Sequence, residues 1–108
     1  MDEKIDITTL TPEQIKQHLN LETGKLSWQE LARHFARGVV LVVDKQLDLI
    51  DVATKMVVDD KDSIAVWLEA QQIMRPDDKH AQTWDEDSTE FWSVVVAPWV
   101  LVQEISLQ

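Results

Sequence analysis

The chain has 108 residues, no cysteine, and twenty acidic against ten basic side chains, which gives a formal net charge of −10. This length is enough for one domain, 1–108, with its own apolar core, and the lack of cysteine excludes disulfides, thiolate catalysis and cysteine-based zinc sites. The charge disfavours nucleic acid and anionic membrane as partners, because both are bound through cationic neutralisation. No signal-peptide pattern and no span-length apolar run occur, so we expect a cytoplasmic protein.

Residues 1–10 are expected to form an extended or poorly ordered lead-in. A first helix then begins, because Thr11 is a good N-cap, Pro12 suits the first helical position and Gln14 completes a capping-box pattern. Gly24 is expected to end this helix.

The second helix has the strongest local signals. Ser27 and Glu30 form a capping-box pattern, and Gly38 is placed to stop the helix in a left-handed conformation. Its core-facing stripe consists of apolar residues three and four apart, namely Trp28, Leu31, Ala32 and Phe35. The five apolar residues 39–43 that follow, four of them β-branched, predict a strand buried on both faces.

Two further helices are predicted over about 47–58 and 63–74, with Pro76 stopping the second of them. The apolar stripe of the 63–74 helix is broad, which indicates packing against more than one neighbour. Residues 77–87 predict a short helix docked by Trp84, and the pair Asp87 and Glu90 indicates a possible helical turn after it.

The segment 91–104 is the most apolar part of the chain and is divided by Pro98. Its halves, 93–97 and 99–104, are strand-like in composition, and the proline, which lacks an N–H, belongs at an edge, a bulge or a crossover. The predicted fold is therefore α+β, with a small sheet of strands near 39–43, 93–97 and 99–104 packed by four to five helices.

Several blocks of this sequence occur together in a recognisable combination: residues 34–40, 47–53, 59–60 and the closing Ala-Pro-Trp-Val-Leu-Val-Gln-Glu of 97–104. The combination resembles a family of small bacterial proteins known only as a domain of unknown function, over about residues 19–104. The resemblance implies a bacterial, cytoplasmic protein. It implies no activity and assigns no catalytic residue.

One candidate surface cluster comes from the polar side of the second helix, where Glu30, Arg33, His34 and Arg37 gather at 100° per residue. These groups suit proton transfer or anion binding, but a solvated helix face with helix-end electrostatics is the favoured interpretation. Asp44 and Asp48 after the buried strand are weaker candidates, because the strand-end rule concerns open parallel sheets. The acidic clusters at 59–62 and 85–87 are interpreted as helix caps.

Pro98 and Trp99 are the candidate interface, because tryptophan is enriched where proteins contact one another. We expect a small protein-interaction or regulatory protein, not an enzyme, without cofactor or metal. The most specific version of this expectation is a homodimer that associates through residues 93–104. Another version is an acidic protein that binds a basic partner. The alternative is a small enzyme or a metal- or ligand-binding protein that uses Glu30, His34 and Arg37, or Asp44 and Asp48.

Overall fold

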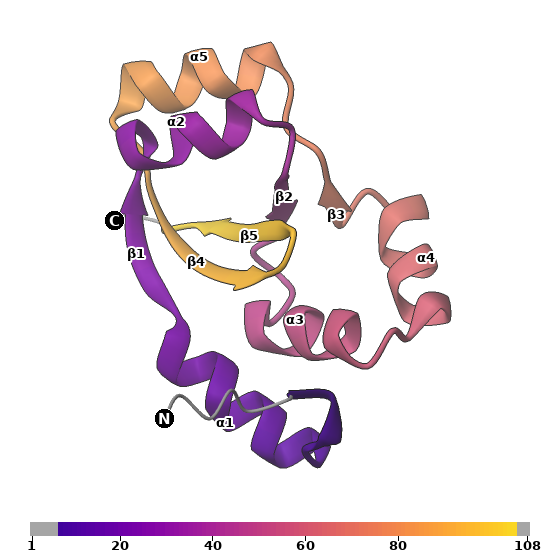
Figure 1. The fold of residues 1–108 in the computed structure, drawn as a ribbon. Coiled ribbons are helices and arrows are strands. Elements are labelled where there is room, and N and C mark those ends of the chain that lie inside the picture. The colour runs from indigo at the N-terminus through magenta and orange to yellow at the C-terminus, as the bar shows by residue number, and fades with distance from the viewer. Residues whose placement is uncertain (1–6, 106–108) are drawn as a thin grey trace.

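The fold is a five-stranded mixed sheet with helices on both faces, and it is seen in a computed structural model that describes residues 7–105 (Figure 1). The helices are η1 (Ile7–Thr9, a 3₁₀ turn), α1 (Pro12–Glu22), α2 (Trp28–Ala36), α3 (Leu49–Val57), α4 (Lys61–Glu69) and α5 (Asp78–Asp87). The strands are β1 (Gly24–Ser27), β2 (Val40–Val43), β3 (Ile73–Met74), β4 (Glu90–Val96) and β5 (Trp99–Glu104). The predicted α+β class is confirmed.

The sheet order is β1-β4-β5-β2-β3, so the last two strands of the chain lie at its centre. β4 and β5 form an antiparallel hairpin, whereas β5 and β2 run parallel, with Leu41 opposite Leu101. Both backbone edges of β4 and of β5 are therefore paired within the chain. The outer strands are β1, which pairs with β4, and β3, which pairs with β2.

Each face of the sheet has its own apolar core, as expected for central strands in which apolar residues occupy consecutive positions. Val100 and Val102 of β5 point to the face covered by α2 and α5, where Trp84 packs edge-on against Phe91 at a centroid distance of 4.9 Å. Leu101 points to the opposite face, which α1 and α3 cover (Figure 1). The prediction that 39–43 is buried on both faces is confirmed in the same way. Val40 belongs to the core beneath α2 and α5, and Leu41 belongs to the core beneath α1 and α3.

The predicted helix starts are confirmed in atomic detail. Thr11 and Ser27 are N-caps with complete capping boxes, and the hydroxyl of Ser27 accepts the Glu30 backbone N–H at 3.2 Å. Gly38 has φ +73 after α2, the left-handed value that a glycine adopts without strain. The short helix predicted over 77–87 is α5, with its Trp84 fully buried.

Two predictions of local structure are wrong, and one strand was not predicted. The first helix ends at Glu22, just before Gly24 as expected, but residues 24–27 then form edge strand β1, which pairs with β4 although only Leu26 among them is apolar. The helix predicted to continue to Met74 ends at Glu69, because Gln71 is left-handed (φ 60) and residues 73–74 pair with β2. No helical turn follows α5, since Glu90 already begins β4.

The lead-in and the chain reversal at Pro98 complete the fold. Of the predicted extended residues, 1–6 lie outside the described part of the chain, and Ile7–Thr9 form the single turn η1. Ala97 and Pro98, joined by a cis peptide bond, make the tight turn between β4 and β5.

Across residues 7–105 no helix combines the length and apolar character that a membrane crossing requires.

Candidate functional site

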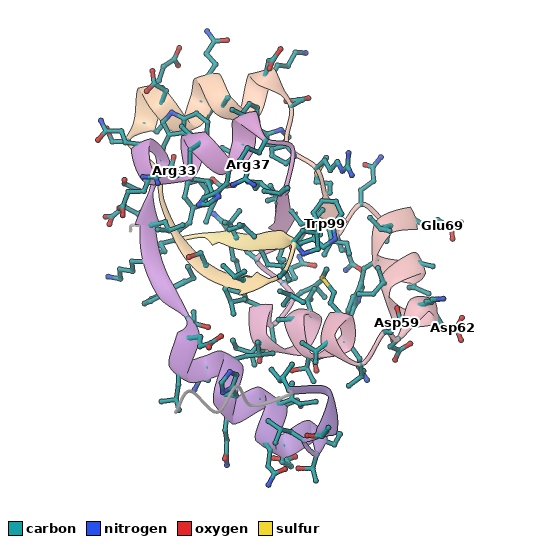
Figure 2. All side chains as sticks on the ribbon, viewed as in Figure 1. Arg33, Arg37, Asp59, Asp62, Glu69 and Trp99 are labelled. Carbon is teal, nitrogen blue, oxygen red and sulfur yellow. The ribbon has the colours of Figure 1, made fainter. Side chains whose placement is uncertain are left out.

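The predicted surface cluster on α2 is spread along an exposed helix face. The Glu30 carboxylate is engaged in the helix cap, where it accepts the Ser27 backbone N–H at 3.2 Å. Arg33 and Arg37 are exposed and His34 is half-buried, and no ion pair joins either arginine to another residue in the range 7–105. The structure therefore shows Glu30 as part of the N-terminal cap of α2, and Arg33 and Arg37 as exposed residues toward the other end of this helix. Figure 2 labels the two arginines.

Asp44 and Asp48 also serve the backbone rather than one another. Asp44 closes the turn after β2, its carboxylate accepting the Gln46 N–H at 2.8 Å. Asp48 is the N-cap of α3 and accepts the Ile50 N–H at 2.9 Å. The two carboxylates line different surface hollows, so the structure does not bring them together.

Two further carboxylates cap helices: Asp60, from the acidic cluster 59–62 as predicted, and Asp77, which lies outside both clusters. The prediction that the cluster 85–87 caps a helix is wrong, because these residues form the last turn of α5. The backbone N–H of Ser63, and then its hydroxyl, hold the pKa of Asp60 below its usual range at the start of α4. The backbone N–H of His80 does the same for the pKa of Asp77 at the start of α5. Among the residues that the structure describes, no group of three or more histidine, aspartate or glutamate side chains is arranged to hold a metal ion.

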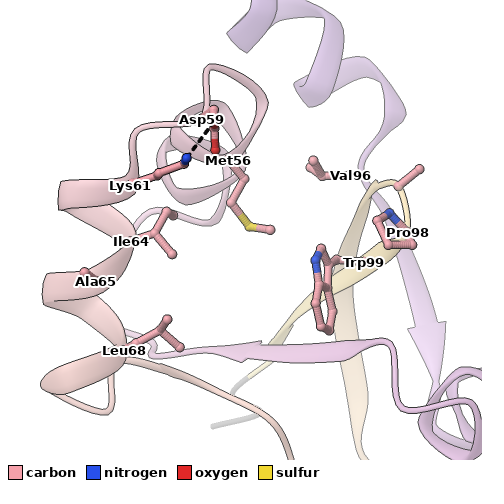
Figure 3. Close-up of a pocket in the computed structure, with 10 residues that line it drawn as sticks. Met56, Asp59, Lys61, Ile64, Ala65, Leu68, Val96, Pro98 and Trp99 are labelled. Atoms are coloured by element: carbon pink, nitrogen blue, oxygen red, sulfur yellow. Dashed lines mark ion pairs between the residues drawn. The ribbon is translucent and has the colours of Figure 1, made fainter.

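Pro98 and Trp99, the candidate interface residues, line a hollow between α4 and the tip of the β4–β5 hairpin (Figure 3). We call this hollow the α4 groove; its volume is about 400 Å³. Its walls come from three parts of the chain, and the lining residues are Met56, Asp59, Lys61, Ile64, Ala65, Leu68, Val96, Ala97, Pro98 and Trp99. Most of these side chains are apolar, so the groove is suited to apolar groups.

The hairpin explains how Trp99 reaches the groove. Val96 and Trp99 are opposite residues across the Ala97-Pro98 turn, and therefore their side chains project to the same face of the sheet. Trp99 is half-buried against the core beneath α3, and the Arg75 guanidinium lies 5.0 Å from the centre of its ring. The tryptophan is thus both a core residue and part of the surface.

The opposite wall, α4, is the least buried long helix of the fold. None of its residues 61–69 is buried, and it is anchored to the core by Ile64 and Trp67, which are themselves only partly covered. Val66 is 61% exposed and Leu68 is 49% exposed. The broad apolar stripe was predicted to pack on more than one neighbour, and α4 does contact both α3 and β3, but it leaves Val66 and Leu68 exposed.

The surroundings of the α4 groove are acidic. Asp59, Asp62 and Glu69 extend outward on this side of the molecule (Figure 2), and residues 59–69 include four carboxylates and a single lysine. That lysine, Lys61, lies 3.9 Å from the Asp59 carboxylate, and both side chains are largely exposed (Figure 3).

The sequence did not lead us to predict the contribution of α4 to this site, although the breadth of its apolar stripe was the available signal.

Comparison with known proteins agrees with this fold. The family described as "Protein of unknown function (DUF2288)" matches residues 14–104. The NMR solution structure of PA1075 from Pseudomonas aeruginosa is 38% identical in sequence, with a TM-score of 0.76 over 87% of each chain. Among curated proteins, none matches the chain. The resemblance expected over residues 19–104 is thereby confirmed at the level of the family, whereas the closing motif remains a prediction as the family's signature.

Proposed function

The chain belongs to the DUF2288 family of proteins of unknown function, and we propose that it acts by protein–protein contact, binding an apolar segment of a different protein in the α4 groove. This proposal refines the expectation of an interaction protein. It places the contact at Pro98 and Trp99, the residues that the sequence singled out, and adds the α4 wall.

The observation that carries the proposal is the exposure of α4. A helix whose apolar residues had no partner would normally turn them toward the core, because burying a leucine or valine side chain is worth about 1.5–3 kcal/mol. Here Leu68 stays exposed in the groove that it shares with the half-buried Trp99, and Val66 is exposed elsewhere on α4. Binding of an amphipathic helix in an apolar groove is a common recognition mode, and exposed apolar patches beside a groove mark such sites.

A different protein is favoured over a second copy of this chain by charge and by geometry. Each copy has a net charge of −10, so two copies repel one another at long range. A two-fold contact through α4 would place the acidic surface of one copy against the same surface of the other. Strand addition to β4 or β5 is closed as a route, since both edges of each are paired.

A binding role is also favoured over the enzymatic or metal-binding alternative. That alternative relied on Glu30, Asp44 and Asp48, and each of these carboxylates already accepts a backbone N–H at a cap or turn. Such carboxylates stabilise local structure, whereas a catalytic acid or base must face a site that admits substrate.

The proposal is tested by site-specific photo-crosslinking in the native host. A benzoylphenylalanine replaces Ala65, which lines the α4 groove, and a matched control replaces Leu21, which is 87% exposed on α1. We expect a discrete adduct with one other protein from the Ala65 position and none from Leu21. The identified partner is then purified, and we expect Leu68→Asp to abolish its binding while Leu21→Asp leaves it unchanged.

Three outcomes would contradict the proposal. One is an adduct at twice the mass of the chain, which would show that the groove receives a second copy. Another is equal crosslinking from both positions, which would indicate random encounters. The third is a purified partner whose affinity is unaffected by Leu68→Asp, because that residue forms part of the groove wall.

A further inference from the structure

We infer that the segment bound in the α4 groove is a basic amphipathic helix, with two lysine or arginine residues seven positions apart on either side of its apolar contact residues. This inference rests on the proposed function and names the chemistry of its partner. It is drawn from the placement of charge along α4.

The first step is the order of residues around α4. At 100° per residue, Ala65 lies beside the groove-lining Leu68, and the side chains that continue outward from it are those of Glu69, Asp62 and Val66. The acidic residues thus border the groove-lining Ala65 on its solvent side, and Val66 lies beyond them. Figure 2 shows Asp62 and Glu69 projecting away from the body of the protein.

The second step is spacing. Asp62 and Glu69 are seven residues apart, which corresponds to about 10 Å along the helix axis, with Ala65 and Val66 between them. A second helix lying along α4 repeats the same interval, so basic residues at positions i and i+7 would meet both carboxylates. On the groove side, its apolar residues at i+3 or i+4 would then contact Ala65 and Leu68, which line the groove.

The third step is the availability of these charges. Neither Asp62 nor Glu69 takes part in an ion pair with another residue of the described chain. Of the nearby cations, Lys61 faces Asp59 at 3.9 Å, whereas Arg75 lies over the Trp99 ring at 5.0 Å and keeps its charge. On α4 itself, a basic partner therefore meets the carboxylates of Asp62 and Glu69, unpaired within the described chain, where an acidic partner would meet repulsion.

The test uses three synthetic fifteen-residue helical peptides with the same leucine-rich face. They differ only at two flanking positions seven residues apart, which are both lysine, both glutamine or both glutamate. Each peptide is labelled with fluorescein and titrated with the full chain, and binding is followed by fluorescence anisotropy at 25 mM and 300 mM NaCl.

We expect the lysine peptide to bind about threefold to tenfold more tightly than the glutamine peptide at low salt, the range that two exposed ion pairs supply. The glutamate peptide should bind most weakly, and the differences should shrink at 300 mM NaCl because exposed pairs are screened. The double variant Asp62→Asn with Glu69→Gln should bind the lysine and glutamine peptides equally. The control Asp85→Asn with Glu86→Gln, on α5, should preserve the preference for lysine.

Three results overturn the inference, and they are distinguishable. If all three peptides bind equally and Leu68→Asp weakens them all, the groove binds apolar helices without regard to charge, and the proposed function stands without this refinement. If none of the peptides binds, the groove is not a helix-binding surface, and both proposals fail. A preference for lysine that persists in the Asp62→Asn with Glu69→Gln variant would also overturn the inference.

Discussion

Replacing leucine by alanine at two positions tests whether the α4 wall is free for a partner. Leu101 lies in the central strand β5 with no exposed area, whereas Leu68 on α4 is 49% exposed. The chemical change is the same at both positions. If Leu68 belongs to a binding surface and not to the core, its replacement should have much the smaller effect on the free energy of unfolding.

The magnitudes follow from burial. Truncating a fully buried leucine costs about 3–5 kcal/mol, because the lost transfer free energy is increased by the cavity left behind. Leu68 loses only half of a leucine's burial and leaves no enclosed cavity, so its truncation should cost about 1 kcal/mol or less. At about 4 °C per kcal/mol for a domain of this size, Leu101→Ala lowers Tm by about 12–20 °C and Leu68→Ala by about 4 °C or less.

The assay is urea unfolding at 25 °C followed by far-ultraviolet circular dichroism, with a common slope for the wild type and both variants. Equal destabilisation by the two substitutions would refute the reasoning, because Leu68 would then be as much a part of the core as Leu101. The same outcome would remove the main support for a groove open to a partner.

Three further results are expected from the same unfolding measurement. Ser88→Gly should raise the free energy of unfolding by about 0.5–1 kcal/mol, because Ser88 ends α5 in the left-handed region at φ 51. An unchanged free energy of unfolding would show that serine adopts this backbone conformation without cost. Asp60→Asn should be less stable than the wild type at pH 7, because Asp60 has a lowered pKa in the folded state. The difference should begin to shrink as pH falls below about 4 and should be lost once the pH is below the folded-state pKa, and a difference independent of pH would contradict this origin. Gln103→Met should lower the free energy of unfolding by about 1–3 kcal/mol, because the Gln103 side-chain amide donates to two backbone carbonyl oxygens of the loop after β2, at 2.7 and 2.9 Å. An unchanged urea midpoint would show that water replaces the amide as the donor.

Elements defined by local chemistry were predictable from the sequence. The starts of α1 and α2 follow from the capping pairs at Thr11 and Ser27, whose hydrogen bonds lie within four residues. The positions of strands β2 and β5 follow from runs of apolar, mostly β-branched residues, which leave no face of the strand suited to solvent. These signals need no knowledge of the rest of the fold.

The two edge strands were not predictable in the same way, because distant pairing creates them. Residues 24–27 become a strand only because β4 lies beside them, and 73–74 leave the helical pattern because Ile73 is buried against β2. Their own compositions favour a turn and a helix. Tertiary contacts outweighed propensity at both places.

The candidate site was predicted in part. Composition singled out Pro98 and Trp99, and the structure places both in a groove. The other wall was missed, because an apolar stripe on a helix indicates burial, and only the positions of α3 and the hairpin show that Val66 and Leu68 remain exposed. The capping role of Glu30 was recognised in the sequence, and the structure adds that the cap occupies the carboxylate that the candidate cluster would have used.

The most direct test of the α4 groove is a nuclear magnetic resonance titration of the ¹⁵N-labelled chain with the lysine peptide. We expect the largest shift changes at Ala65, Leu68 and the Trp99 indole N–H, which lie in or beside the groove walls, and little change at Leu21 or Arg33. Shift changes centred on α2 or α1, or the absence of change at Trp99 under saturating peptide, would contradict the assignment of the groove as the binding surface.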